Sequence, residues 1–178
     1  MATRTWGVDP THSDVQFKIR HLMITNVSGS FNIFQASVET EGEDFSKAKV
    51  TFTADVESIT TGSEQRDGHL KSPDFFDAAT YPQIKFTTTK AEPVDNDGSY
   101  TLYGDLTIRD ITKNVKMSVE FGGVVKDGYG NTKAGFTING KINRKDFGLT
   151  WNAATEAGGL LLSDEVKLMA EIQLIEQA

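Results

Sequence analysis

The sequence of 178 residues contains no cysteine. This absence excludes a disulfide scaffold, a thiolate zinc site and a cysteine nucleophile. It does not identify the redox compartment, because a cysteine-free chain is compatible with oxidising and reducing surroundings alike. The sequence also lacks an uninterrupted apolar run long enough to cross a bilayer as a helix, so we do not expect an integral membrane protein.

Positive charge is scarce, because 18 lysines and arginines stand against 25 aspartates and glutamates, giving a net charge of −7. Phosphate backbones and anionic membrane surfaces both require a basic protein surface, so neither nucleic acid nor an anionic membrane is an expected partner. The first residues, MATRTW, contain no apolar signal-peptide core. We therefore expect a cytoplasmic protein, or a periplasmic one if a signal was removed.

The length predicts a single domain over residues 1–178 that buries its own core. Apolar and polar residues alternate with a period of two in about eight segments, which predicts β-strands with one dry and one wet face. In the segment 27–38 the apolar phase slips between Ile33 and Phe34, which indicates a β-bulge. The predicted strands are 15–20, 27–38, 49–57, 84–90, 100–108, 115–121, 136–142 and 166–173.

Several short antiparallel strands predict an all-β fold, either a closed barrel or a sandwich. We favour an extended antiparallel barrel of about eight strands, because closure removes the edges and leaves one inside face. The segment 62–79 breaks the alternation and predicts one or two helical turns. It carries apolar residues to bury, including Phe75, and we predict that it forms a lid over the barrel mouth.

Small residues recur on the dry faces, for example Gly29, Gly104 and Gly140, each between large apolar neighbours. Two interpretations stay open: these glycines let strands bend at barrel corners, or the missing side chains leave a cavity. An apolar lumen would select an apolar ligand. The candidate wall residues are Phe17, Phe31, Phe52, Phe86, Leu102, Leu106, Met117, Phe121 and Phe136.

A few large polar residues fall where a ligand head group would need them. His21 and Arg144 continue the apolar phase at strand ends, and inward polar groups require partners. Arg66 and His69 lie in the predicted lid, where they either bind a head group or hold loops through ion pairs. The three histidines show no metal-ligand spacing, and no catalytic or cofactor motif is present, so we expect neither metal nor cofactor.

A series of short motifs, taken in order, resembles the YceI-like family, also called polyisoprenoid-binding proteins, over essentially the whole chain. Each motif alone is weak, but the ordered set is highly specific. The motifs are Trp6, Asp9-Pro10, His12-Ser13, Phe17, His21, Gly29-x-Phe31, Ser58-Ile59-x-Thr61-Gly62, Arg66-Asp67-x-His69-Leu70, Asp74-Phe75-Phe76-Asp77, Tyr81-Pro82-x-Ile84-x-Phe86, Gly104-Asp105-Leu106-Thr107-Ile108 and Asn143-Arg144-x-Asp146-Phe147-Gly148-Leu149.

The resemblance implies an extended lipocalin-like barrel whose lumen holds a long isoprenoid or a fatty amphiphile, such as a prenyl diphosphate or a ubiquinone. It also implies a homodimer, and many relatives are periplasmic. Three hypotheses follow: a non-catalytic lipid carrier or store, an enzyme acting on such a lipid at the mouth, or a stress-protective protein with a solid barrel. The enzyme would use His21, Arg66, Asp67 and His69 as acid and base groups.

Overall fold

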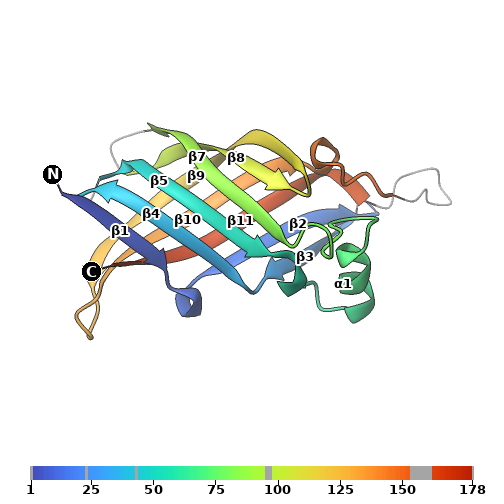
Figure 1. Ribbon diagram of the computed structural model, residues 1–178, viewed down its shortest axis with the longest axis horizontal. Coiled ribbons are helices and arrows are strands. Elements are labelled where there is room, and N and C mark those ends of the chain that lie inside the picture. The colour runs from blue at the N-terminus through green and yellow to red at the C-terminus, as the bar shows by residue number, and fades with distance from the viewer. Residues whose placement is uncertain (1, 23, 43, 95–97, 153–161, 178) are drawn as a thin grey trace.

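The computed structural model describes residues 2–22, 24–42, 44–94, 98–152 and 162–177, most of which are in β-strands (Figure 1). The strands are β1 (Thr3–Val8), β2 (Asp14–His21), β3 (Thr25–Phe31), β4 (Phe34–Glu41), β5 (Asp44–Asp55), β6 (Ile59–Thr60), β7 (Gln83–Pro93), β8 (Tyr100–Ile108), β9 (Ile111–Lys126), β10 (Thr132–Asn143) and β11 (Leu162–Glu176). The one α-helix of the described residues is α1 (Glu64–Lys71), and short 3₁₀ helices span Pro10–His12, Val56–Ser58 and Arg144–Phe147.

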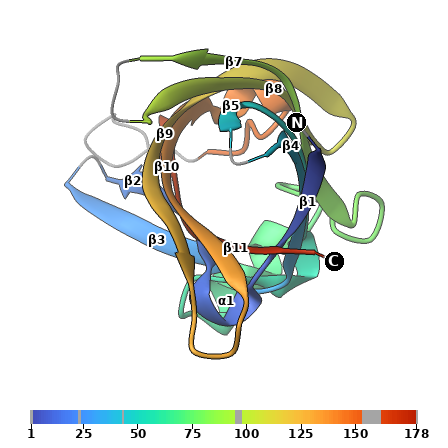
Figure 2. The ribbon, with the colours of Figure 1, turned by 90° about the vertical axis from the view of Figure 1, so that its left-hand side faces the viewer.

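The strands form a closed antiparallel barrel, as predicted. Eight of them follow one another in the order β1-β4-β5-β7-β8-β9-β10-β11, and β11 returns to pair with β1. The closing register places Trp6 opposite Glu176 and Val8 opposite Leu174. Figure 2 looks along the barrel and shows the strands arranged around its axis.

The three remaining strands, β2, β3 and β6, continue the barrel wall at the end where α1 lies (Figure 1). Strand β11 pairs with β2 over its first part and with β1 over its last residues. A 3₁₀ turn separates β1 from β2, and another separates β5 from β6. The strand that neighbours β11 therefore changes from β2 to β1 along its length, and β2, β3 and β6 make the wall longer than the eight closing strands alone.

The expected β-bulge at Ile33 and Phe34 was wrong, because the chain breaks there into two strands. A bend at Asn32 and Ile33 ends β3 and begins β4, which pair with different neighbours, β2 and β1. Ile33 is 57% exposed at this bend, whereas Phe31 and Phe34 on either side are buried. The hydroxyl of Ser58 accepts a hydrogen bond from the Ile33 amide at 3.0 Å and stabilises the bend. The change of apolar phase in the sequence therefore corresponds to this bend.

The predicted helical insert begins at Ser63, whose side chain accepts a hydrogen bond from the backbone nitrogen of Arg66 and caps α1. After Lys71 the chain continues through turns to Ala78, whose amide donates to the Lys71 carbonyl at 2.9 Å. The helix lies at the end of the barrel opposite both termini (Figure 1). It therefore lies at the end of the barrel where a lid is expected, and the lid role stays a prediction.

The other end of the barrel is filled by aromatic side chains. Trp6 is 0% exposed and donates from Nε1 to the Thr40 hydroxyl at 2.9 Å. Its ring lies 5.1 Å from that of Phe45, which lies 4.9 Å from Phe136. Large apolar rings with one satisfied polar group make a stable plug. The plug closes the interior near the termini.

Asp9 fixes the corner where β1 gives way to β2. Its carboxylate accepts from the Thr11 hydroxyl at 2.7 Å, from His12 Nδ1 at 2.8 Å and from Lys133 Nζ at 3.1 Å. These donors, Thr11 first, hold the pKa of Asp9 well below its usual range. The charged form of Asp9 therefore stabilises the fold.

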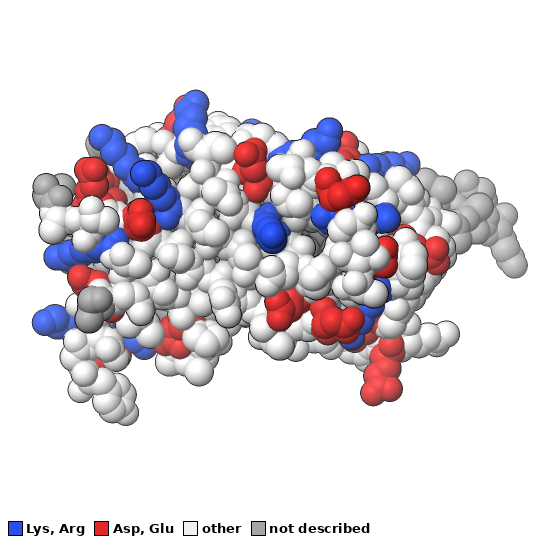
Figure 3. All heavy atoms as spheres, in the orientation of Figure 1, with Lys and Arg blue, Asp and Glu red and all other residues white. Residues whose placement is uncertain are grey.

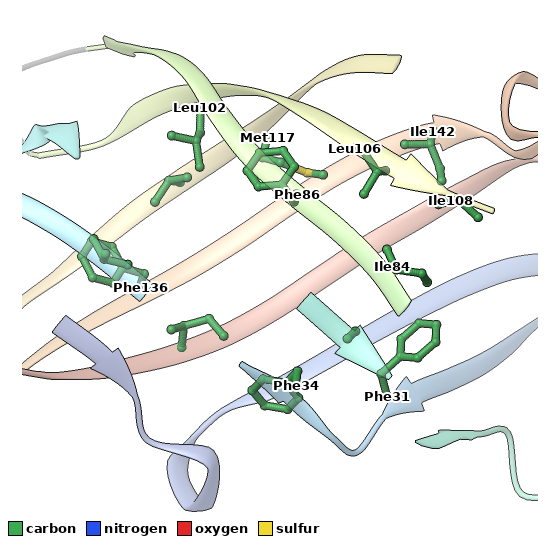
Figure 4. Packing of buried hydrophobic residues seen from close by; sticks show 14 of the residues in the cluster. Phe31, Phe34, Ile84, Phe86, Leu102, Leu106, Ile108, Met117, Phe136 and Ile142 are labelled. Carbon is green, nitrogen blue, oxygen red and sulfur yellow. The ribbon is translucent and has the colours of Figure 1, made fainter. Parts of the chain in front are cut away.

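The barrel interior is apolar because strand alternation sends every second side chain inward. Figure 4 shows Phe86, Leu102 and Met117 pointing inward from three neighbouring strands. On the face of the molecule seen in Figure 3, basic and acidic side chains are intermixed around a largely uncharged middle. Within the described part of the chain, no helix is long and apolar enough to cross a membrane.

The dry-face glycines do not create the open space that one interpretation of the sequence expected. A Cβ atom on Gly104 would overlap the ring of Phe86, and one on Gly140 would overlap the Met117 side chain. Gly29 is covered in the same way by Phe17, its register partner in β2. Large side chains thus lie over glycines of the adjacent strand, an arrangement that suits a strongly curved sheet.

Candidate ligand-binding cavity

A cavity of about 440 Å³ occupies the barrel interior between the aromatic plug and the lid. This volume falls within the roughly 300–1,000 Å³ typical of small-molecule sites. All but two of the predicted site residues line it. Those on the wall are Phe17, His21, Phe31, Phe52, Arg66, Phe75, Phe86, Leu102, Leu106, Met117, Phe136 and Arg144.

The wall is almost entirely hydrocarbon. Inward residues of β2, β5, β7, β8, β9, β10 and β11 supply it, and the apolar alternation of the sequence identifies most of them. Burial raises the pKa of Tyr100, a wall residue, well above its usual range. The polar groups on the described wall are few: the side chains of Gln16, His21, Thr61, Arg66 and Arg144, the hydroxyl of Tyr100 and the indole N–H of Trp151.

Two predicted site residues lie outside the cavity. Phe121 packs into the plug, with its ring 5.6 Å from Phe45 and 5.4 Å from Phe136. Phe121 has the predicted inward phase in β9, but it packs against these two rings and does not line the cavity. His69 lies on α1, and its Nε2 pairs with Asp74 Oδ2 at 2.9 Å. The inward phase of a strand residue therefore did not suffice to predict that Phe121 lines the cavity, and a position in the predicted lid did not suffice for His69.

The lid contributes aromatic side chains to the cavity end. Phe75 and Phe76 line the cavity, and Phe76 meets Phe31 edge-on at 6.1 Å. Trp151 closes the same end, with its ring 5.4 Å from Phe75 and 4.7 Å from His69. The sequence interpretation missed Trp151, because it follows β10 in a segment without periodicity. A cluster of three rings, those of His69, Phe75 and Trp151, thus connects the lid segment to the loop beyond β10.

Arg66 and Asp67 share Thr61 instead of forming the ion pair that one interpretation expected. Arg66 donates from Nε to the Thr61 hydroxyl and from Nη2 to the Thr61 carbonyl, both at 2.7 Å. Asp67 accepts from the Thr61 amide at 2.8 Å and from its hydroxyl at 2.6 Å. The start of α1 is consequently fastened to the strand that precedes it.

Arg144 is the most deeply buried basic residue of the described wall, at 2% exposure. Its Nε donates to the Ser163 carbonyl at 2.8 Å, and its Nη1 donates to the carbonyls of Leu149 and Trp151 at 2.6 and 2.7 Å. Burial lowers the pKa of Arg144, and the carboxylate of Asp164 opposes that effect. Arg144 thus joins the loop after β10 to the beginning of β11.

The acid–base groups named for an enzyme do not converge. His21 and Arg66 line the cavity, whereas Asp67 and His69 do not. Asp67 is bound to Thr61 of the wall, and His69 is paired with Asp74. Among the described residues, no group of three or more histidines, aspartates and glutamates could hold a metal ion. What the arrangement can do chemically is enclose a long apolar chain and meet a polar group near the lid.

These features define a class of protein: a closed antiparallel barrel with an apolar lumen, aromatic side chains packed at one end and a short helical segment at the other. The model of the YceI-like domain matches residues 6–174. The UPF0312 protein SAS2572 of Staphylococcus aureus is 40% identical over 166 residues, covering 93% of this chain and 94% of the relative. The chain belongs to the YceI-like family.

Solved structures share the fold. The YceI protein of Campylobacter jejuni superposes with a TM-score of 0.76 at 35% identity, covering 90% of this chain and 91% of that one. BcnA of Burkholderia cenocepacia gives 0.78 at 25% identity, covering 93% and 98%. A polyisoprenoid-binding domain from Saccharophagus degradans gives 0.68 at 16% identity, covering 97% and 98%, and this likeness concerns the fold alone.

Proposed function

We propose that the protein binds a long-chain amphiphilic lipid in its lumen and carries or stores it without chemical change. The ligand class is a polyisoprenoid, a prenyl diphosphate or a quinone with a long tail. The observation that carries this proposal is the apolar cavity of about 440 Å³. A barrel built only for stability would fill that space, because empty volume lined by apolar groups costs stability.

The shape of the cavity supports a lipid over a compact ligand. Wall residues extend from Phe136 beside the plug to Phe75 and Arg66 beside the lid, so the cavity runs along the barrel. An extended hydrocarbon chain fills such a space and displaces water from it. The name of the Saccharophagus domain, which describes polyisoprenoid binding, agrees with this ligand class.

A carrier is favoured over an enzyme because neither Asp67 nor His69 lines the cavity, and both already have hydrogen-bond partners. General acid–base catalysis needs a titratable group within hydrogen-bond reach of the reacting atom. We propose no reaction for this site. Incubating the protein with a prenyl diphosphate and recovering it unchanged in mass supports the carrier, and a product of altered mass contradicts it.

The experiment that tests lipid binding is direct. The purified protein is extracted with organic solvent, and the extract is analysed by mass spectrometry beside an extract of a barrel variant with a blocked lumen. Leu102→Trp serves as that variant, since Leu102 lines the cavity and a larger side chain occupies ligand space. A long-chain lipid present only in the unaltered protein supports the proposal. A lipid-free extract and no uptake of added prenyl lipids would refute it.

The homodimer implied by the resemblance stays a prediction. Light scattering coupled to size-exclusion chromatography measures the mass in solution and decides between one chain of 19.5 kDa and two. The compartment also stays a prediction, and fractionation of cells that produce the natural protein tests it.

A further inference from the structure

The guanidinium of Arg144 has one nitrogen that the protein leaves unused. Nε and Nη1 donate to three backbone carbonyls, those of Ser163, Leu149 and Trp151. Nη2 is buried and has no hydrogen-bond partner among the described residues. A buried donor without an acceptor is costly, so such a group in a native structure requires an explanation.

The position of Arg144 indicates what could supply the acceptor. The residue lines the cavity, two positions after the wall residue Ile142 of β10. The nearby Asp164 does not line the cavity. Its Oδ1 forms an ion pair with Lys145 Nζ at 3.3 Å, and it is buried without a hydrogen-bond partner, as Nη2 is. No described wall residue accepts from Nη2, so a ligand in the lumen is one source from which this acceptor can come.

We propose that Nη2 of Arg144 binds a single carbonyl oxygen at the polar end of the lipid. This inference rests on the proposed lipid-binding function and adds the chemistry of the head group. A carbonyl oxygen only accepts hydrogen bonds, and it brings no donor of its own that the apolar wall would leave unpaired. Ketones, esters, tertiary amides and quinones present this group without an N–H or O–H donor.

The donor count argues against a diphosphate at this position. Arginine recognises phosphate with two parallel N–H groups on adjacent nitrogens. In Arg144 both neighbours of Nη2 are already committed to backbone carbonyls. A phosphate would have to break one of those bonds to be held by a fork, whereas a single oxygen needs no rearrangement.

The test uses three ligands that share a geranylgeranyl chain and end in a methyl ketone, a diphosphate or hydrogen. Binding to the delipidated protein is followed by tryptophan fluorescence, since Trp151 lies at the lid end of the cavity. We expect the ketone to bind about 10-fold tighter than the hydrocarbon, as a hydrogen bond to a charged donor predicts. Equal affinity of ketone and hydrocarbon overturns the proposal while lipid binding stands.

Arg144→Lys removes the unused donor selectively. The ammonium of the substituted lysine has three donors, and three backbone carbonyls compete for them. We expect the ketone to lose its advantage of about 10-fold over the hydrocarbon in this variant. An unchanged ketone preference overturns the proposal.

Arg66→Lys is the matched variant, because Arg66 also lines the cavity but donates to Thr61. We expect it to keep the ketone preference. If the diphosphate binds best and loses affinity in Arg66→Lys, the head group lies at Arg66 and the proposal is wrong. If none of the three ligands binds, the proposed function fails and this inference fails with it.

A measurement on the unaltered protein covers the case in which Arg144→Lys does not fold. The ketone is labelled with ¹³C at its carbonyl, and its chemical shift is compared between the bound state and hexane. A downfield shift on binding is expected for a carbonyl that accepts from a guanidinium. A bound carbonyl with its hexane shift overturns the proposal.

Discussion

Gly104 offers a sharp test of how the barrel wall is packed. A Cβ atom on this residue would overlap the Phe86 ring and would lie 2.7 Å from the Thr87 carbonyl oxygen. Part of that obstruction is backbone, so it cannot be relieved by turning a side chain alone. Gly104→Ala should therefore destabilise the fold by about 2 kcal/mol, within the range for overpacked cores. For a chain of this length that corresponds to a fall in Tm of about 4–8 °C.

Gly135→Ala is the matched control, because no atom lies within 4 Å of a Cβ at that position of β10. We expect it to be neutral or stabilising by about 0.4–1 kcal/mol, since alanine restricts the unfolded chain. The pair is compared by urea unfolding and by calorimetry. Equal midpoints for Gly104→Ala and Gly135→Ala would refute the packing of Phe86 over Gly104. Combining Gly104→Ala with Phe86→Leu should cost less than the sum of the two, since the residues are in contact.

Three further predictions concern the corner, the plug and the lid. Because the pKa of Asp9 is lowered in the folded state, its carboxylate stabilises the fold above the unfolded-state pKa of about 3.9, and this stabilisation is lost as the pH falls below that pKa. In urea unfolding, Asp9→Asn should therefore lose less stability than the unaltered protein between pH 7 and pH 3. Equal losses would contradict this. Phe121→Ala should destabilise the fold by about 3 kcal/mol without changing lipid affinity, because Phe121 lies in the plug. Calorimetry measures the stability and lipid titration measures the affinity. Weakened lipid binding would place Phe121 at the binding site. Amide exchange over 66–76 should slow when lipid binds, and unchanged exchange in mass spectrometry would exclude a lid role.

The alternation of polar and apolar residues made most of the barrel predictable. In β2, Val15, Phe17 and Ile19 all line the cavity, as their phase required. The first strand escaped the prediction, because in TRTWGV only Trp6 and Val8 are large apolar residues. Its place in the barrel comes from pairing with β4 and β11, which are distant in sequence.

Cross-strand register was beyond the reach of sequence patterns. The sequence shows that Gly140 is small and inward, but only the pairing of β10 with β9 places Met117 opposite it. The same limit applies to the site. The phase predicted that Arg144 faces inward, yet its bonds to Leu149 and Trp151 depend on how an irregular loop folds back. Local pattern fixes the face of a residue, and tertiary pairing fixes its neighbours.

Joining the first strand to the last has a consequence for how the protein is made. The pairs Trp6–Glu176 and Val8–Leu174 link residues near opposite ends of the chain. Contacts of such large sequence separation form late, because the intervening chain must first be ordered. During synthesis the inner faces of β4 to β10 have no enclosed lumen, and two open sheet edges are exposed until β11 emerges. The closed lumen therefore forms only after the last strand has been made, so a lipid of the proposed class would be loaded after synthesis.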